Sequence, residues 1–113
     1  MDSTAILQEI YSLVDRLDDL CVKWSKAKAD KNYGDEMKQV TLNLEKAKSS
    51  SKTSAGREEE AYRSEAYKNY LYKVFEIDCV YYSLDAQKSL LEKKLDAYRS
   101  LLAYERSMGD KTK

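Results

Sequence analysis

The sequence predicts an all-α fold: a long antiparallel helical hairpin of coiled-coil character, with a kink in its first helix, that oligomerises into a helical bundle. The 113 residues contain no Pro and three Gly, the two residue types that most disfavour helices. Apolar residues recur at alternating spacings of three and four, and one Ser-rich segment separates two such patterns. We expect a single helical domain over 1–113, with helix one at about 4–48, a loop at 49–56 and helix two at about 57–107.

Helix one carries a heptad pattern in its first half and the same pattern, shifted, in its second half. The first set of core positions is Ile10, Leu13, Leu17, Leu20, Trp24 and Ala27. Continuing in phase would place Lys31 and Gly34 in the core, where both are poor residues. The apolar pattern instead resumes one residue out of phase, at Tyr33, Met37, Val40, Leu44 and Ala47. We therefore expect a break near 32–36, as a kink, a stutter or a short turn, and favour a local break over a full reversal.

Polar residues predict where both helices begin. Helix one has three candidate N-caps: Asp2, Ser3 and Thr4. The segment KSSSKTSAGREEE (48–60) is the one clear loop, and Ser54 is the candidate N-cap of helix two. The acidic triplet 58–60 suits the positive end of the following helix dipole, and Glu59 has a favourable i,i+4 partner in Arg63. We interpret the triplet as a helix start rather than as a metal site.

The middle of helix two is apolar on more than one face. Its core positions are Tyr67, Tyr70, Val74, Ile77, Tyr81, Leu84, Leu91, Leu95, Tyr98 and Leu102, with Lys88 as the single interruption. One neighbouring helix covers one face only, so a second copy of the chain is the simplest cover for the rest. We expect this oligomer interface to contain Leu71, Phe75, Cys79, Tyr82 and Ala86.

Tyrosine is over-represented, with ten in the chain, and Lys and Arg lie between several of them. Single-stranded nucleic acid is bound by such a mixture, because rings stack on bases and cations contact phosphates. The alternative is that the rings fill helix contacts and half-buried interfaces, and the periodicity assigns Tyr67, Tyr70, Tyr81 and Tyr98 to that role. The candidate contact residues for nucleic acid or a partner are Lys68, Tyr72, Lys73, Arg99, Tyr104 and Arg106.

Several classes of function are disfavoured by what the sequence contains. Twenty basic and twenty acidic residues give a formal net charge of zero, so no overall field attracts nucleic acid or a membrane. The absence of His removes the commonest general base and metal ligand, and no phosphate-binding Gly-rich loop is present. We expect no enzyme activity, no catalytic residue, no metal and no cofactor. Cys21 and Cys79 are interpreted as small buried residues of a protein in a reducing compartment. The sequence has no transmembrane stretch, so it predicts a cytoplasmic protein without membrane association.

The Ser-rich loop, EEEAYRSEAYKNYL and AYRSLLAYERSMG together resemble a family of small uncharacterised phage and prophage coiled-coil proteins. In that family the second helix ends in an aromatic–Arg–Ser–Leu–Leu–x–x–Glu–Arg pattern. Here the matching residues are Tyr98, Arg99, Ser100, Leu101, Leu102, Glu105 and Arg106. The aromatic residue of the family is often Trp, so Tyr98 is a departure. The similarity covers residues 48–108, and the first helix is similar in character only.

The resemblance implies a setting among phage recombination and replication genes, and the layout is also similar to phage recombination mediators that bind single-stranded DNA. The sequence-based hypothesis is therefore a non-enzymatic, homo-oligomeric helical protein of the host cell cytoplasm. It would assist DNA recombination or replication by binding single-stranded DNA, a recombination or host protein, or both. The alternative is a pure protein-interaction module, such as a host-takeover inhibitor or an assembly adaptor, without nucleic-acid binding.

Overall fold

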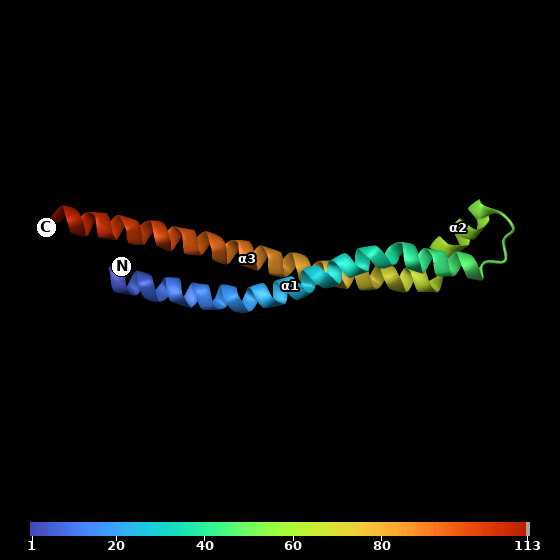
Figure 1. Ribbon diagram of the computed structural model, residues 1–113, viewed down its shortest axis with the longest axis horizontal. Coiled ribbons are helices and arrows are strands. Elements are labelled where there is room, and N and C mark those ends of the chain that lie inside the picture. Colours follow the sequence, from blue (N-terminus) through green and yellow to red (C-terminus); the bar gives the residue numbers. More distant parts are fainter. Residues whose placement is uncertain (113) are drawn as a thin grey trace. The chain divides into compact units, whose positions relative to one another are not determined.

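The computed structural model describes residues 1–112, with side chains up to Gly109, and consists of three helices. They are α1 (Ser3–Lys48), α2 (Ser54–Arg63) and α3 (Glu65–Thr112) (Figure 1). No strand is present within residues 1–112. The predicted all-α helical hairpin is confirmed, because α1 and α3 pack against each other in opposite directions in each of two compact units. Unit 1 comprises Met1–Ser25 with Ser83–Lys113, and unit 2 comprises Lys26–Tyr82.

The helix starts are set by side-chain caps. The Asp2 carboxylate accepts the backbone N–H of Ala5 at 2.8 Å, so one of the three predicted caps of α1 is the observed one. At α2 the prediction of Ser54 is wrong by one residue. Thr53 has the extended conformation of an N-cap, and its hydroxyl accepts the N–H of Gly56 at 3.0 Å, which makes Ser54 the first helical residue.

The single long second helix expected from about 57 onwards is wrong, because Ser64 divides it. Ser64 has φ −68° and ψ 152°, an extended conformation that no helix interior tolerates. Its hydroxyl donates to the carbonyl of Ala61 at 2.7 Å and accepts the N–H of Tyr67 at 3.1 Å. One side chain therefore closes α2 and caps α3, which is why Ser is favoured over a better helix former here.

Of the three alternatives for the break near 32–36, a kink, a stutter or a short turn, the short turn is excluded, because α1 is helical from Ser3 to Lys48. Lys31 is half-buried and Gly34 is buried, so the in-phase positions do face α3. The shifted apolar positions point elsewhere: Tyr33 keeps 64% of its area exposed and Leu44 59%. The change of phase in the sequence therefore marks a second apolar face on one continuous helix.

Unit 1 is held by a row of leucines. Leu13, Leu20, Leu91 and Leu95 form its buried cluster, with Ile10, Leu17, Leu84 and Tyr98 packed around them. Lys88 interrupts this apolar row without cost because its ammonium lies 4.9 Å from the centre of the Trp24 ring and 2.7 Å from Glu92. The Trp24 indole in turn donates to Asp85 at 2.9 Å, so the polar edge of the ring is also satisfied.

In unit 2, α2 adds a third helix to the α1–α3 pair at the end that carries the loop. Leu42 of α1, Ala61 of α2 and Tyr67 of α3 form the buried cluster, and Tyr70 packs against it. The rings of Tyr62 and Tyr67 meet edge to face at 5.2 Å between centres. The division at Ser64 is what allows the short α2 to place Ala61 on Leu42.

Candidate protein-interaction site

A row of apolar residues on α1 in unit 2 has no covering helix. Its members, here called the α1 row, are Tyr33, Met37, Val40, Leu44 and Ala47. All are exposed except Met37, which is half-buried. The spacing of four, three, four and three residues is that of core positions in a coiled coil, where such a row packs against another helix. Within unit 2, α3 packs against the in-phase positions of α1, such as Lys31 and Gly34, and does not cover the α1 row.

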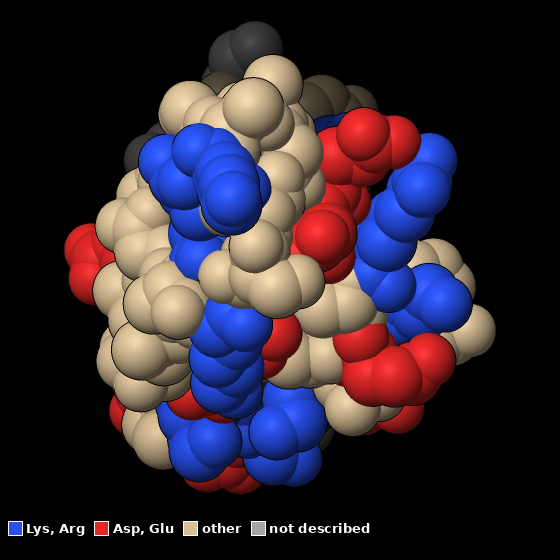
Figure 2. All heavy atoms as spheres, turned by 90° about the vertical axis from the view of Figure 1, so that its right-hand side faces the viewer, with Lys and Arg blue, Asp and Glu red and all other residues tan. Residues whose placement is uncertain are grey.

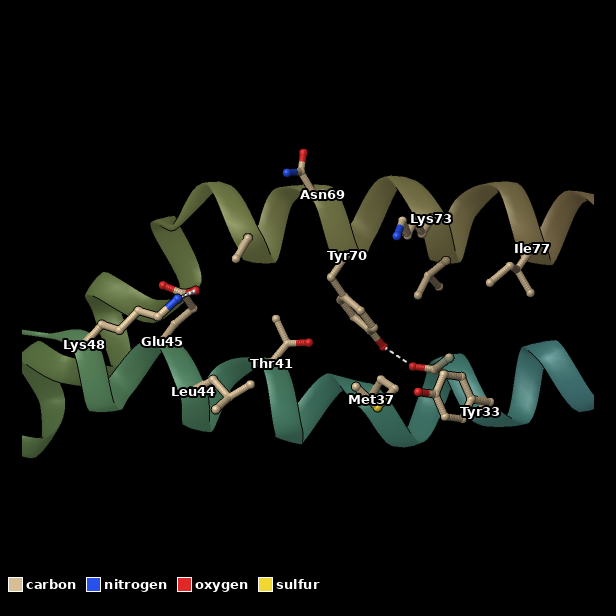
Figure 3. Close-up of a pocket in the computed structure, with 13 residues that line it drawn as sticks. Tyr33, Met37, Thr41, Leu44, Glu45, Lys48, Asn69, Tyr70, Lys73 and Ile77 are labelled. Atoms are coloured by element: carbon tan, nitrogen blue, oxygen red, sulfur yellow. Dashed lines mark hydrogen bonds and ion pairs between the residues drawn. The ribbon is translucent and has the colours of Figure 1, made fainter.

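Three members of the α1 row line one wall of a groove of about 500 Å³ between α1 and α3 (Figure 3). Tyr33, Met37 and Leu44 line it from α1. Ala66, Tyr70, Val74 and Ile77 of α3 are the apolar residues of the opposite wall. The lining is mostly apolar, as in surfaces that bind helices or peptides rather than polar small molecules.

The inner edge of the groove is fixed by a contact between Tyr70 and Gly34. The phenol of Tyr70 points from α3 to α1 and donates to the Gly34 carbonyl at 2.6 Å (Figure 3). Partial burial raises the pKa of Tyr70 above its usual 10.0, which keeps the phenol a donor. A Cβ on Gly34 would meet Ile77 and Val74 at 3.8 and 3.9 Å, which is ordinary van der Waals contact. The hydrogen bond, rather than a steric need for glycine, therefore sets this part of the groove.

The rim of the groove carries charge. Lys48 is paired with Glu45 at 3.2 Å on the α1 side. On the α3 side lies Lys73, which has no ion pair among the side chains that the structure describes. Over the face that carries the loop, Lys and Arg lie next to Asp and Glu, without a large patch of one sign (Figure 2). Lys73 is therefore the rim residue best placed to attract an acidic group.

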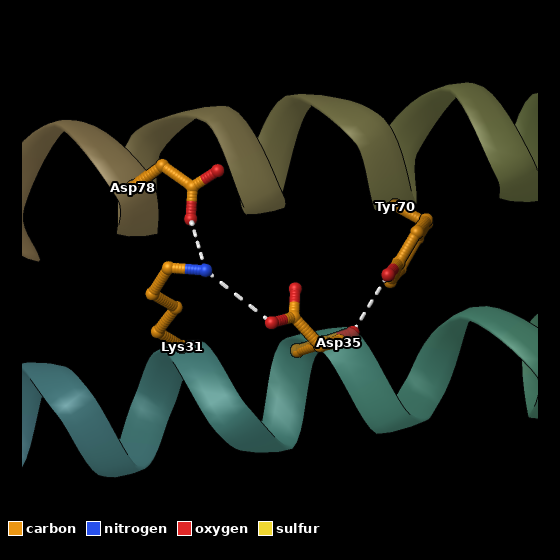
Figure 4. A network of polar contacts seen from close by, with 5 residues as sticks. Lys31, Asp35, Tyr70 and Asp78 are labelled. Carbon is orange, nitrogen blue, oxygen red and sulfur yellow. Dashed lines mark hydrogen bonds and ion pairs between the residues drawn. The ribbon is translucent and has the colours of Figure 1, made fainter.

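A polar network on unit 2 fixes how α1 faces α3. The Lys31 ammonium lies 3.3 Å from Asp35 and 3.8 Å from Asp78 of α3 (Figure 4), and 5.9 Å from the centre of the Tyr82 ring. The hydrogen bond to Asp35 is the main reason that the pKa of Lys31 is raised above 10.5. One Asp78 oxygen is buried and has no hydrogen-bond partner, so Lys31 is its compensation. Neither carboxylate lines the groove, and the Lys31–Asp78 contact joins α1 to α3.

The predicted oligomer interface lies on one face of α3, and all five of its residues are exposed. Leu71, Phe75, Cys79 and Tyr82 are exposed in unit 2, and Ala86 is exposed in unit 1. The expected burial of Cys79 within the chain is therefore wrong, while Cys21 is half-buried. Oligomerisation itself stays a prediction.

The six predicted contact residues are divided between the two units. Lys68, Tyr72 and Lys73 belong to unit 2, where Lys68 is 3.6 Å from Glu65 and only Lys73 lines the groove. The other three, Arg99, Tyr104 and Arg106, belong to unit 1 and are all exposed. Arg99 lies 3.9 Å from Asp96. The assignment of four tyrosines to helix contacts is confirmed, since Tyr67 is buried and Tyr70, Tyr81 and Tyr98 are half-buried.

Sequence reasoning missed the groove, although its signal was present. Two apolar rows one residue apart on the same helix indicate two helix-facing surfaces as readily as they indicate a break. Choosing between these readings required knowing that the helix continues through Gly34.

Among the residues with described side chains, no three Cys, Asp or Glu lie close enough to hold a metal ion. A bilayer-crossing helix, long and apolar enough for that role, is not found within the described chain. No family model, curated protein or solved structure matches this chain.

Proposed function

We propose that the chain is a non-enzymatic interaction protein whose groove binds an amphipathic helix of a partner protein. The observation that carries this proposal is the exposed α1 row. A stretch of heptad-spaced apolar residues on an uninterrupted helix is a surface for a further helix, and α3 does not cover it.

The dimensions of the groove support a helix as the occupant. From Tyr33 to Leu44 the α1 row extends over about 16 Å, three turns of helix. A third helix lying between α1 and α3 would place its apolar ridge against Met37, Val74 and Ile77. Lys73 on the rim favours a partner helix with an Asp or Glu beside its apolar face.

Single-stranded DNA is the second candidate ligand. Tyr72 is exposed over 72% of its area, and Lys68 lies one turn before it on the same face of α3. An exposed ring beside a cation is the minimal arrangement for stacking a base and contacting its phosphate. This candidate agrees with the resemblance to phage proteins, which supports recombination or replication as the setting in which either ligand is bound.

Photo-crosslinking identifies the occupant of the groove. Benzoylphenylalanine replaces Leu44, which is 59% exposed, in one variant and Val22, a 73% exposed α1 residue of unit 1, in a control variant. In the cells that express the protein, we expect a defined protein adduct from position 44 and none from position 22. The crosslinked segment, made as a peptide, should become helical on binding. Its affinity should fall at least tenfold with Leu44→Glu and stay unchanged with Val22→Glu.

Two results would contradict this function. One is an adduct that forms equally from both positions, and the other is a crosslinked segment without an apolar helical face. Fluorescence anisotropy with a labelled single-stranded oligonucleotide tests the second candidate. If DNA is the ligand, binding weakens with salt and with Tyr72→Ala, whereas no binding at low salt removes this candidate.

A further inference from the structure

The α3 stripe, defined as Leu71, Phe75, Cys79 and Tyr82, is a second apolar surface of unit 2. Its members are spaced by four, four and three residues, so they lie on one face of the helix. Phe75 leaves 68% of its area exposed and Tyr82 58%. None of these four residues lines the groove, so the stripe is a separate surface.

We propose that a second copy of this chain docks on the α3 stripe with its own α3 antiparallel. The two-fold axis passes between Asp78 and Cys79, and Phe75 of each copy packs against the partner's Tyr82. This inference goes beyond the proposed function and does not depend on what the groove binds.

The spacing of the stripe makes it complementary to itself. Phe75 lies as far before the midpoint between Asp78 and Cys79 as Tyr82 lies after it. An antiparallel two-fold therefore forms the same aromatic pair twice, as an interface between identical subunits requires. Edge-to-face or offset packing of such a pair is favourable beyond the area that it buries. Tyr82 is already oriented by its edge-to-face contact with Tyr81, at 5.2 Å between centres.

The exposed area fits a weak but specific dimer. Aromatic side chains bury roughly 150–250 Å² each, so the exposed parts of Phe75 and Tyr82 with that of Leu71 offer roughly 300 Å² per copy. Two copies then bury roughly 600 Å² of apolar surface. The smallest stable interfaces bury roughly 1,200 Å² in total, and in homodimers about 65% of that area is apolar. The stripe thus supplies most of the apolar part of such an interface, and we expect a weak, reversible dimer.

Charge selects the antiparallel direction. In a parallel pair Lys68, three residues before the first member of the stripe, would lie beside Lys68 of the partner subunit. In the antiparallel pair the two lysines are separated along the axis by about 32 Å. The only carboxylate next to the proposed axis, Asp78, already faces Lys31 at 3.8 Å, which limits its repulsion of the partner's Asp78. The chain as a whole has a formal net charge of zero, so association is not opposed by the overall field.

Sedimentation equilibrium of the full chain between about 1 and 200 µM tests the dimer. We expect a monomer–dimer equilibrium that Phe75→Glu shifts at least tenfold towards monomer. Tyr11→Glu, at an equally exposed ring of unit 1, should leave it unchanged. Circular dichroism establishes that each variant is folded. A chain that stays monomeric at the highest concentration overturns the proposal. So does a dimer that Tyr33→Glu abolishes and Phe75→Glu does not, because the second copy would then occupy the groove.

Crosslinking tests the direction of the pair. In a Cys21→Ala background, Cys79 lies next to the two-fold axis, and a short bismaleimide should join the two copies. Lys68→Cys in a chain that also carries Cys21→Ala and Cys79→Ala should give no crosslinked dimer. Efficient crosslinking at position 68, or none at Cys79 in a chain that sediments as a dimer, would refute the antiparallel arrangement.

Discussion

Leu42→Ala should release α2 from the rest of unit 2. Leu42 is 2% exposed and is the one buried residue of α1 in the cluster that joins all three helices. Leu-to-Ala changes at such sites cost about 2–5 kcal/mol. The cluster is small and lies at the end of the helix pair, where neighbours can close part of the cavity. We therefore expect about 2–3 kcal/mol, equivalent to roughly a 30- to 150-fold change in an equilibrium constant.

Hydrogen exchange locates this loss of stability. A ten-residue helix such as α2 is not stable alone, so its amides should exchange faster by the full factor once Leu42 is truncated. Amides around Leu13 and Leu20, in unit 1, should change much less. Leu44→Ala is the matched control: the same chemical change two residues away, at a side chain that is 59% exposed, should cost less than about 0.5 kcal/mol. Unchanged exchange in α2 would mean that Ala61 and Leu42 do not hold it, and the account of the cluster would be wrong.

Three other substitutions test single contacts. Gly34→Ala should stabilise the protein by about 0.5–1 kcal/mol in denaturant unfolding, because the Cβ fits at 3.8 Å and alanine is the better helix former; a destabilisation would show that the helices approach more closely. Tyr70→Phe should cost about 1 kcal/mol at pH 7 by loss of the 2.6 Å bond to Gly34. The raised pKa of Tyr70 means that the unfolded chain loses this proton first as pH rises above 10.0. Stability should therefore fall in that range in the parent more than in Tyr70→Phe. Lys88→Ala should lower the denaturant midpoint of unfolding and shift the emission of Trp24, because it removes the ammonium 4.9 Å from the ring, while exposed Lys94→Ala should do neither.

The fold was predictable because it rests on periodicity. The leucine row of unit 1 and the tyrosines that face the partner helix follow from a spacing of three and four residues, and the structure has them there. The break at Ser64 was not predictable. A serine inside a helical pattern either stays in the helix or ends it, and here the outcome depends on the hydrogen bonds of its hydroxyl with Ala61 and Tyr67. Lys31 and Lys88 looked like flaws in the core. Their partners, Asp78 and the Trp24 ring, lie on the other helix, so the sequence around each lysine does not predict these contacts.

The candidate site was predictable in part. The exposed apolar face of α3 was predictable, because the middle of this helix has apolar residues on more faces than one neighbouring helix can cover. The structure leaves that face exposed. The groove could not be derived, because its two walls come from different helices. Which residues around Val74 lie opposite the α1 row is defined only once the two helices pack together.

The two rows on α1 lie on different faces of the helix, so α3 cannot cover both of them fully. They are offset by one residue, so a rotation of this helix by about 100° about its own axis would turn Tyr33 and Met37 towards α3 and expose Gly34. That alternative would remove Leu42 from its cluster with Ala61 and Tyr67. It is opposed by the Lys31–Asp78 pair and the Tyr70–Gly34 hydrogen bond, which are compatible with one facing only. These polar contacts thus fix the facing of α1 in unit 2, and in that facing four of the five members of the α1 row stay exposed.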